Sequence, residues 1–289
     1  MSSEVLMAGS TSERFDVQMF RTARMDMPTH WVYYQGGMGW SPIAYYAVMA
    51  RNSEHAVLIG GDFQPDDSVI SDIWRDLGEQ YAGAEGRTRM SLQREPQNLL
   101  AQLAEADIVP EDVTHVVLSP LLCFATGTLS LFPNAELLVG RQGWEEFWVP
   151  ERPADDPRPH RYHRPPLPRD CVVPRPQVEY LLDHWDRLRM LDDEDTVCDG
   201  ITTFFAGVHH RSTLAVRVES TAGVVIWTDA AWHDANIADD IALGVPEDLR
   251  EARDAYARIR READIALAAH DPGHLGRFPG GRIVAVTSS

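Results

Sequence analysis

Apolar and polar positions in the first half of the chain alternate in a way that predicts strands separated by a helix. "IAYYAVMA" (43–50) and "HAVLIGGDF" (55–63) are rich in β-branched and aromatic residues and are predicted to form paired strands, the second ending at a glycine pair. Leucines at helical spacing predict a helix over 93–106. "HVVLS" (115–119) and "AELLVG" (135–140) are predicted to be short buried strands.

The second half repeats this alternation with more strands. "ITTFFAG" (201–207), "STLAVRVES" (212–220) and "GVVIWTDA" (223–230) predict three strands, the last two joined by a turn. Residues 246–264 form an amphipathic, charge-rich pattern that predicts a helix, and "IALAA" (265–269) predicts a final buried strand. Two β-rich halves with interleaved helices favour helix–sheet–sheet–helix layering.

The pattern is consistent with one domain over residues 1–289, with residues 1–25 as an N-terminal extension. The stretch 150–176 contains nine prolines. We predict a long loop there, because proline lacks the backbone donor that helices and sheets use.

Composition excludes several classes of function. The net charge of −18 argues against nucleic acid as a partner, since phosphate neutralisation needs clustered basic residues. All 26 basic residues are arginine, which excludes lysine Schiff-base chemistry. No segment has the length and apolarity of a membrane span, and no secretion signal is evident. The widely spaced Cys123, Cys171 and Cys198 fit reduced thiols in the cytoplasm.

Four segments occur in an order and at spacings that resemble those of a known superfamily. They are "DIVPEDVTHVVLSPLLCFATG" (107–127), "LFPNAELLVGRQGWEEF" (131–147), "FFAGVHHRSTLAVRVESTAGVVIWTDAAWHDAN" (204–236) and "LAAHDP" (267–272). Together they resemble the metallo-β-lactamase fold superfamily over residues 40–278, and within it the quorum-quenching N-acyl homoserine lactonase-like proteins. The resemblance implies an α+β fold: an αββα sandwich of two mixed β-sheets flanked by helices.

The same resemblance implies a site for two metal ions, held by histidines and aspartates, that activates water and polarises a carbonyl. Carried over position by position, only Asp229 and His270 match those ligands. The other ligand positions hold Gly60, Pro120, Leu122, Phe124, Ala125 and Val208. Two protein donors cannot hold a catalytic dizinc centre. We therefore expect no metal and no other cofactor.

The catalytic candidates are Asp229, His270, His209 and His210, since buried titratable groups often mark functional sites. Asp229 and His270 have an equally plausible structural role, in which they tie two loops together. His209 and His210 are adjacent, so their side chains point to opposite faces of an extended segment and at most one of them faces the pocket.

The substrate-binding candidates are Leu122, Cys123, Phe124, Trp40 and His233. The former ligand loop is uniformly apolar, which suits an organic ligand. Cys123 fits a small buried hydrophobe better than a nucleophile. We expect two or three of the nearby aromatic residues to line the pocket; these are Tyr33, Tyr34, Trp40, Tyr45, Tyr46, Trp144 and Trp148.

Three interpretations remain open from the sequence. The first is a metal-independent enzyme that acts on a small apolar carbonyl or lactone substrate, for example in secondary metabolism. The second is a non-catalytic relative that binds a small molecule in the old cavity. The third is a hydrolase with a relocated single metal on Asp229, His270 and one of His209, His210 or His233. The oligomeric state, a homodimer included, is left open.

Overall fold

The computed structural model describes residues 13–65, 68–148, 173–207 and 209–285. Within these residues, the first sheet has eight strands in the order β13-β1-β2-β3-β5-β6-β7, with β4 beside β1. Their bounds are β1 Asp16–Pro28, β2 Trp40–Arg51, β3 Ala56–Ile59, β4 Gln93–Arg94, β5 His115–Leu118, β6 Glu136–Gly140, β7 Leu188–Leu191 and β13 Arg282–Ile283. β1, β2 and β3 pair antiparallel, whereas β3, β5, β6 and β7 pair parallel, so this sheet is mixed.

The second sheet has five strands in the order β12-β11-β10-β9-β8. Their bounds are β8 Glu194–Cys198, β9 Ile201–Phe205, β10 Leu214–Ser220, β11 Gly223–Thr228 and β12 Ile265–Ala268. β11 and β12 pair parallel and the other neighbours pair antiparallel, so the second sheet is also mixed.

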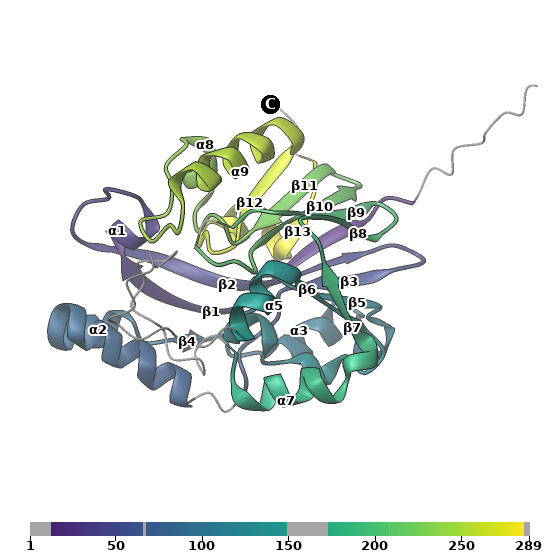
Figure 1. Cartoon of the computed structure of the whole chain (residues 1–289), viewed down its shortest axis with the longest axis horizontal. Helices are drawn as coiled ribbons and strands as arrows, with labels where there is room; N and C mark the ends of the chain where they lie inside the picture. Colours follow the sequence, from purple (N-terminus) through teal and green to yellow (C-terminus); the bar gives the residue numbers. More distant parts are fainter. Residues whose placement is uncertain (1–12, 66–67, 149–172, 208, 286–289) are drawn as a thin grey trace, which may run out of the picture.

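Helices cover the outer face of each sheet, with α8 and α9 on one side and α3, α5 and α7 on the other (Figure 1). The α-helices are α1 Thr29–Val32, α2 Ser68–Arg89, α3 Leu99–Glu105, α4 Cys123–Thr126, α5 Arg141–Trp148, α7 Arg175–Asp183, α8 Asp234–Ala238, α9 Leu249–Glu262 and α10 His274–Arg277. Short 3₁₀ turns occur at Pro110–Asp112, Leu129–Leu131, Trp185–Arg187 and Pro279–Gly281. The predicted αββα sandwich of two mixed sheets is confirmed.

The strands are apolar on both faces because both faces are buried. Val117 of β5 and Trp227 of β11 face the layer between the sheets. Their neighbours Val116 and Ile226 face the helices on opposite outer sides of the sandwich. Side chains alternate between the faces of a strand, so each central strand supplies two cores at once. This explains why the strands appear in the sequence as unbroken apolar runs.

Two helices begin later than the leucine and charge patterns predict, and a capping side chain explains each difference. The side chain of Asn98 accepts a hydrogen bond from the backbone N–H of Ala101, and α3 begins at Leu99. Asp248 accepts hydrogen bonds from two backbone N–H groups in the same way, and α9 begins at Leu249. Such caps satisfy donors that the first helical turn leaves unpaired.

Two elements fall where the sequence analysis expected none. Most of β1 lies within residues 1–25, the stretch expected to be an N-terminal extension. The second element, α2, breaks at Ala82 and Gly83, and the φ of Gly83 is +59°. The two arms of α2 pack closely at Gly78 and Gly86. A Cβ added at either glycine would lie 2.3 Å or less from the backbone oxygen of the other. Within the predicted loop 150–176, residues 150–172 lie outside the described part, and the end of the stretch begins α7.

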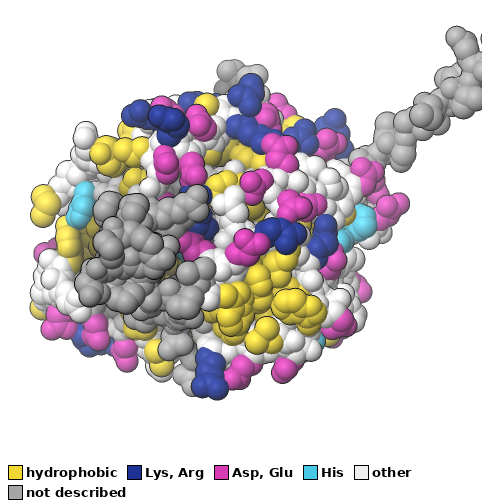
Figure 2. Space-filling view, in the orientation of Figure 1, with side chains coloured by type: hydrophobic (Ala, Val, Ile, Leu, Met, Phe, Trp, Pro, Cys, Tyr) yellow, Lys and Arg dark blue, Asp and Glu magenta, His cyan; other side chains and the backbone are white. Residues whose placement is uncertain are grey.

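Arginine and carboxylate side chains are interspersed over the visible surface (Figure 2). Arg258 of α9 contacts Glu194 of β8 at 2.6 Å and Glu262 of its own helix at 3.0 Å. Exposed pairs of this kind each contribute little to stability. In the described part of the chain, no helix combines the length and apolarity that crossing a bilayer requires.

Neighbouring leucines of α3 provide a test of the layer between this helix and the first sheet. Leu99 is 1% exposed and Leu100 is 40% exposed. We expect Leu99→Ala to lower the free energy of unfolding by about 2–5 kcal/mol, because it removes buried methyl groups and leaves a cavity. Leu100→Ala is the matched control and should change it by less than about 1 kcal/mol. Denaturant unfolding measures both, and equal losses would contradict this packing.

Candidate active site

A buried carboxylate stands at the end of β11. Asp229 directly follows the strand and its side chain is completely buried. The hydroxyl of Thr228 accepts a hydrogen bond from the N–H of Ala230 at 3.1 Å and donates to the carbonyl of Leu214 at 3.2 Å. These bonds fix the backbone on either side of Asp229, so the carboxylate has a defined direction.

His270 approaches Asp229 from the neighbouring parallel strand, β12. Its Nε2 lies 2.9 Å from Oδ1 of Asp229, and its side chain is 4% exposed. Its Nδ1 lies 2.8 Å from the carbonyl oxygen of Ala44 in β2. A carbonyl can only accept, so Nδ1 carries a proton and Nε2 is the nitrogen directed at the carboxylate.

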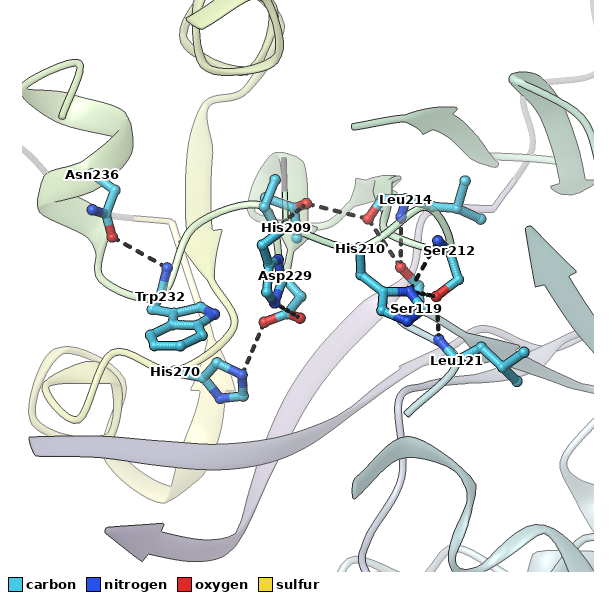
Figure 3. Close-up of polar contacts among 12 residues, drawn as sticks. Ser119, Leu121, His209, His210, Ser212, Leu214, Asp229, Trp232, Asn236 and His270 are labelled. Atoms are coloured by element: carbon cyan, nitrogen blue, oxygen red, sulfur yellow. Dashed lines mark hydrogen bonds and ion pairs between the residues drawn. The ribbon is translucent and has the colours of Figure 1, made fainter. Parts of the chain in front are cut away.

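His209 contacts the other oxygen of the same carboxylate. Its Nε2 lies 3.1 Å from Oδ2 of Asp229, and its side chain is 6% exposed (Figure 3). Nδ1 of His209 is buried and, within the described residues, has no hydrogen-bond partner. The two oxygens of Asp229 likewise have no partner there with hydrogen-bond geometry, so both histidines make close ion-pair contacts with them.

His210 points away from this group. Its Nδ1 lies 2.5 Å from the hydroxyl of Ser212 and accepts the N–H of the same residue at 3.2 Å (Figure 3). The Ser212 hydroxyl accepts the N–H of Leu121 at 2.6 Å, which joins the loop after β9 to the loop after β5. Of the two adjacent histidines, His209 therefore contacts Asp229, and His210 is directed toward Ser212.

Aromatic rings surround the Asp229–histidine group. The ring of His270 lies 4.7 Å from Tyr45, 5.3 Å from Phe124 and 5.9 Å from Trp232, measured between ring centroids. Trp232 also lies 5.6 Å from His209. The charged group therefore lies in a largely apolar setting, in which charge interactions are stronger than in water.

Burial and the two histidines act on Asp229 in opposite directions. Burial alone would raise the pKa of this carboxyl, because it penalises the charged form. The histidines outweigh burial and hold the pKa well below its usual range. The carboxylate is thus ionised, and its two histidine partners stabilise it.

Phe124 of the apolar loop after β5 reaches this group. Phe124 packs against both His270 and Tyr45. Cys123 is buried in the same cluster of apolar side chains as Tyr45. Leu122 is half-buried at the start of α4, and no specific contact connects it to the histidines.

Two of the predicted residues lie elsewhere. Trp40 donates to Glu85 at 3.0 Å and packs on Tyr81, both in α2. His233 contacts the Tyr33 hydroxyl at 2.6 Å and the carbonyl of Pro42 at 2.9 Å, so both of its ring nitrogens are engaged away from Asp229. His233 lies only four residues after Asp229 in the sequence, but its ring contacts Tyr33 and Pro42 and not the Asp229 carboxylate.

The sequence analysis missed two aromatic residues at this site. Trp232 lies three residues after Asp229 and packs against both of its histidine partners. Phe63 packs on Tyr45 and Phe124, with ring centroids 5.0 and 6.1 Å away. The available signal was position alone, since each follows the end of a central strand within four residues.

The arrangement of layers matches that of known enzymes. A solved N-acyl homoserine lactone hydrolase, with the product N-hexanoyl-L-homoserine at its catalytic metal centre, superposes with a TM-score of 0.68 at 15% identity, covering 93% of this chain and 99% of that one. The chain has the metallo-β-lactamase fold. AidC, a dizinc quorum-quenching lactonase, superposes on this metallo-β-lactamase fold with a TM-score of 0.60 at 13% identity, covering 96% of this chain and 97% of that one.

Sequence comparison gives a weaker likeness to a protein of the same kind. AttM, an N-acyl homoserine lactonase of Azorhizobium caulinodans, is 28% identical over 188 residues, which cover 62% of this chain and 66% of AttM, just under two thirds of its length. No protein-family model matches the chain.

The donors found at this site can be compared with the number that a two-metal centre requires. In the described part of the chain, Asp229, His209 and His270 are the potential metal ligands that contact one another here, and each histidine contacts one oxygen of the carboxylate. Phe124 fills space beside His270. A catalytic zinc ion takes about three protein donors, so three donors in all do not fit two ions.

The lowered pKa of Asp229 predicts an effect of pH on stability. A carboxyl whose pKa is lower in the folded state stabilises the protein fully above its unfolded pKa of about 3.9, and loses this contribution as pH falls toward the folded pKa. Below about pH 4 the wild type should therefore lose up to about 1.4 kcal/mol more per pH unit than Asp229→Asn. Denaturant unfolding between pH 2.5 and 6 measures this difference.

Asp254→Asn is the charge-matched control, because Asp254 is exposed on α9. It should follow the acid dependence of the wild type. An Asp229→Asn variant with that same dependence would show that the histidines do not stabilise the carboxylate.

Proposed function

We propose that the chain is a hydrolase-like enzyme that acts without metal on a small apolar compound with an ester or lactone carbonyl, in secondary metabolism. One observation carries this proposal: a buried imidazole, His209, is held by Asp229 through one nitrogen while its other nitrogen is unpartnered in the described part of the chain. A buried unpartnered nitrogen costs about 1–3 kcal/mol, so a site that retains one has reason to offer it to a ligand.

His209 is the general base in this proposal. Its Nε2 faces a carboxylate oxygen and so carries the proton, which leaves the lone pair on Nδ1. Asp229 orients the ring and stabilises the imidazolium that forms when Nδ1 takes a proton. An aspartate plays this part beside the base of serine hydrolases as well.

His270 supplies the charge that allows Asp229 to stay ionised. Nδ1 of His270 donates to Ala44 and Nε2 faces the carboxylate, so the ring that best fits both partners carries protons on both nitrogens. In this proposal His270 is the ring that balances Asp229, and His209 is the ring that accepts a proton. The two histidines thus have different roles set by their second contacts.

The reaction that fits these groups is hydrolysis. Nδ1 of His209 removes a proton from water as the water oxygen bonds to the carbonyl carbon. The carbon–oxygen bond of the ester or lactone then breaks, and the proton passes from His209 to the leaving oxygen. Phe124 and Trp232 supply the apolar wall that suits such a substrate.

A relocated single metal is the second candidate function. Ligand histidines commonly donate their other N–H to a backbone carbonyl, as His270 does to Ala44. Of the third ligands considered from the sequence, only His209 lies at Asp229, since His210 and His233 are engaged elsewhere. Non-catalytic binding in the same aromatic setting is the outcome if no turnover is found.

Substitution at adjacent histidines tests the proposed base. We expect His209→Gln to reduce turnover of an accepted lactone or aryl ester by about 10²-fold or more, because general bases typically contribute that much. His210→Gln is the matched control. It should lower the melting temperature through the lost Ser212 contact and leave turnover per folded molecule unchanged. Equal turnover in wild type and His209→Gln would remove His209 from the mechanism.

Metal analysis separates the two candidates. We expect purified protein to hydrolyse its substrate equally well before and after dialysis against EDTA, and we expect no zinc-dependent hydrolysis of N-hexanoyl homoserine lactone. Elemental analysis of wild type and Asp229→Ala provides the check. A stoichiometric transition metal that disappears in Asp229→Ala, together with turnover that EDTA abolishes, would establish the single-metal alternative.

A further inference from the structure

A second group of metal-binding side chains lies at the opposite end of β5 from the candidate active site. His55 immediately precedes β3, His115 is the first residue of β5, and Cys198 is the last residue of β8. One ligand atom from each lies within 4.8 Å of the other two, and all three residues are half-buried. The two imidazole rings are 5.7 Å apart between centroids.

Hydrogen bonds of Thr114 determine which nitrogen of His115 is available. The single hydroxyl proton of Thr114 is donated to the carbonyl of Ala56, 3.0 Å away. The same hydroxyl lies 2.8 Å from Nδ1 of His115, so there it accepts, and Nδ1 carries the proton. The lone pair of His115 is therefore on Nε2. Such an N–H contact is the arrangement that orients metal-bound histidines.

We propose that His55, His115 and Cys198 bind one divalent transition metal ion of the zinc type. Two imidazoles and a thiolate are ligands that Zn²⁺ prefers over magnesium or calcium. Oε2 of Glu136 in β6 lies 3.9 Å from Nε2 of His115, but the same oxygen pairs with Nε of Arg189 at 3.1 Å, so in this proposal water completes a tetrahedral set. This site is separate from Asp229 and plays no part in the proposed hydrolysis.

The proposed ion joins the two sheets. His55 and His115 lie at the N-terminal ends of β3 and β5 in the first sheet, whereas Cys198 is the last residue of β8 in the second sheet. Binding to the folded state alone raises its stability by mass action. We therefore assign the site a structural role, as a clip at the end of the sandwich remote from Asp229.

Cobalt substitution tests the proposal with a signal specific for the thiolate. Purified, chelator-treated full-length protein is titrated with Co²⁺ under reducing conditions, and the near-ultraviolet thiolate-to-cobalt charge-transfer band is followed. We expect saturation at one equivalent, displacement by Zn²⁺, and a higher melting temperature with Zn²⁺ than without. Cys198→Ser should abolish the band, and His55→Ala and His115→Ala should each weaken Co²⁺ binding by about 100-fold or more.

Two control variants separate this site from the rest of the molecule. Cys123→Ala removes a cysteine from the loop after β5, and Asp229→Asn alters the candidate active site; both should retain the band and its stoichiometry. Circular dichroism confirms that each variant is folded. Absence of a stoichiometric band in folded wild type, or a band that survives Cys198→Ser, would overturn the proposal. Loss of the band in Asp229→Asn alone would place the ion at the active site instead.

Discussion

The candidate active site depends on keeping one carboxylate ionised inside an apolar sandwich. Asp229 is fully buried, and an isolated charge there would cost several kcal/mol or would take up a proton. His209 and His270 prevent this, one at each oxygen. His270 reaches Asp229 because β11 and β12 run parallel in register and end at the same edge, whereas His209 comes from the loop after β9. The charge on Asp229 can therefore be kept only if the strands of the second sheet keep their pairing.

The loop after β5 belongs to a shared fold and carries an aromatic side chain beside the candidate site. The strands of the sandwich are held by packing that depends on apolar volume, and similar layers persist at 15% identity to a lactonase with a catalytic metal centre. A residue at the rim affects packing less than one between the sheets. Phe124 at the rim packs onto His270 without disturbing the strand that leads to it. The rim thus accommodates an apolar side chain beside the histidine.

The sequence predicted the architecture better than the site. Central strands buried on both faces produce apolar runs that are hard to mistake, and β5, β6, β10 and β11 were found in this way. β1 and the broken helix α2 were not anticipated: a bulge between Arg21 and Ala23 interrupts the alternation in β1, and the break at Ala82 and Gly83 interrupts α2. Asp229, His270 and His209 come together as expected. The aromatic rings around these three residues are placed by the geometry of the loops, which cannot be read from the spacing of residues in the sequence.

Trp40 and His233 illustrate that limit. Both are close in sequence to strands that reach the rim, yet each is held by a specific polar partner elsewhere: Glu85 for Trp40, and Tyr33 with the Pro42 carbonyl for His233. A hydrogen bond of this kind decides a side chain's direction, and it depends on residues distant in the sequence. Trp232, by contrast, faces the histidines because the turn after Asp229 brings it back toward them.

The backbone of Ala44 links the carboxylate group to the edge of the first sheet. β3 pairs only with residues 48–51 of β2, so the earlier part of that strand is not covered by β3. At Ala44 the hydrogen-bonding partner is His270. The carbonyl of His270 accepts the N–H of Ala44 at 3.0 Å, and the ring of His270 donates to the carbonyl of Ala44. One residue thus closes an open strand edge and orients an imidazole. The rate of amide hydrogen exchange at Ala44 would consequently report how often the two sheets separate.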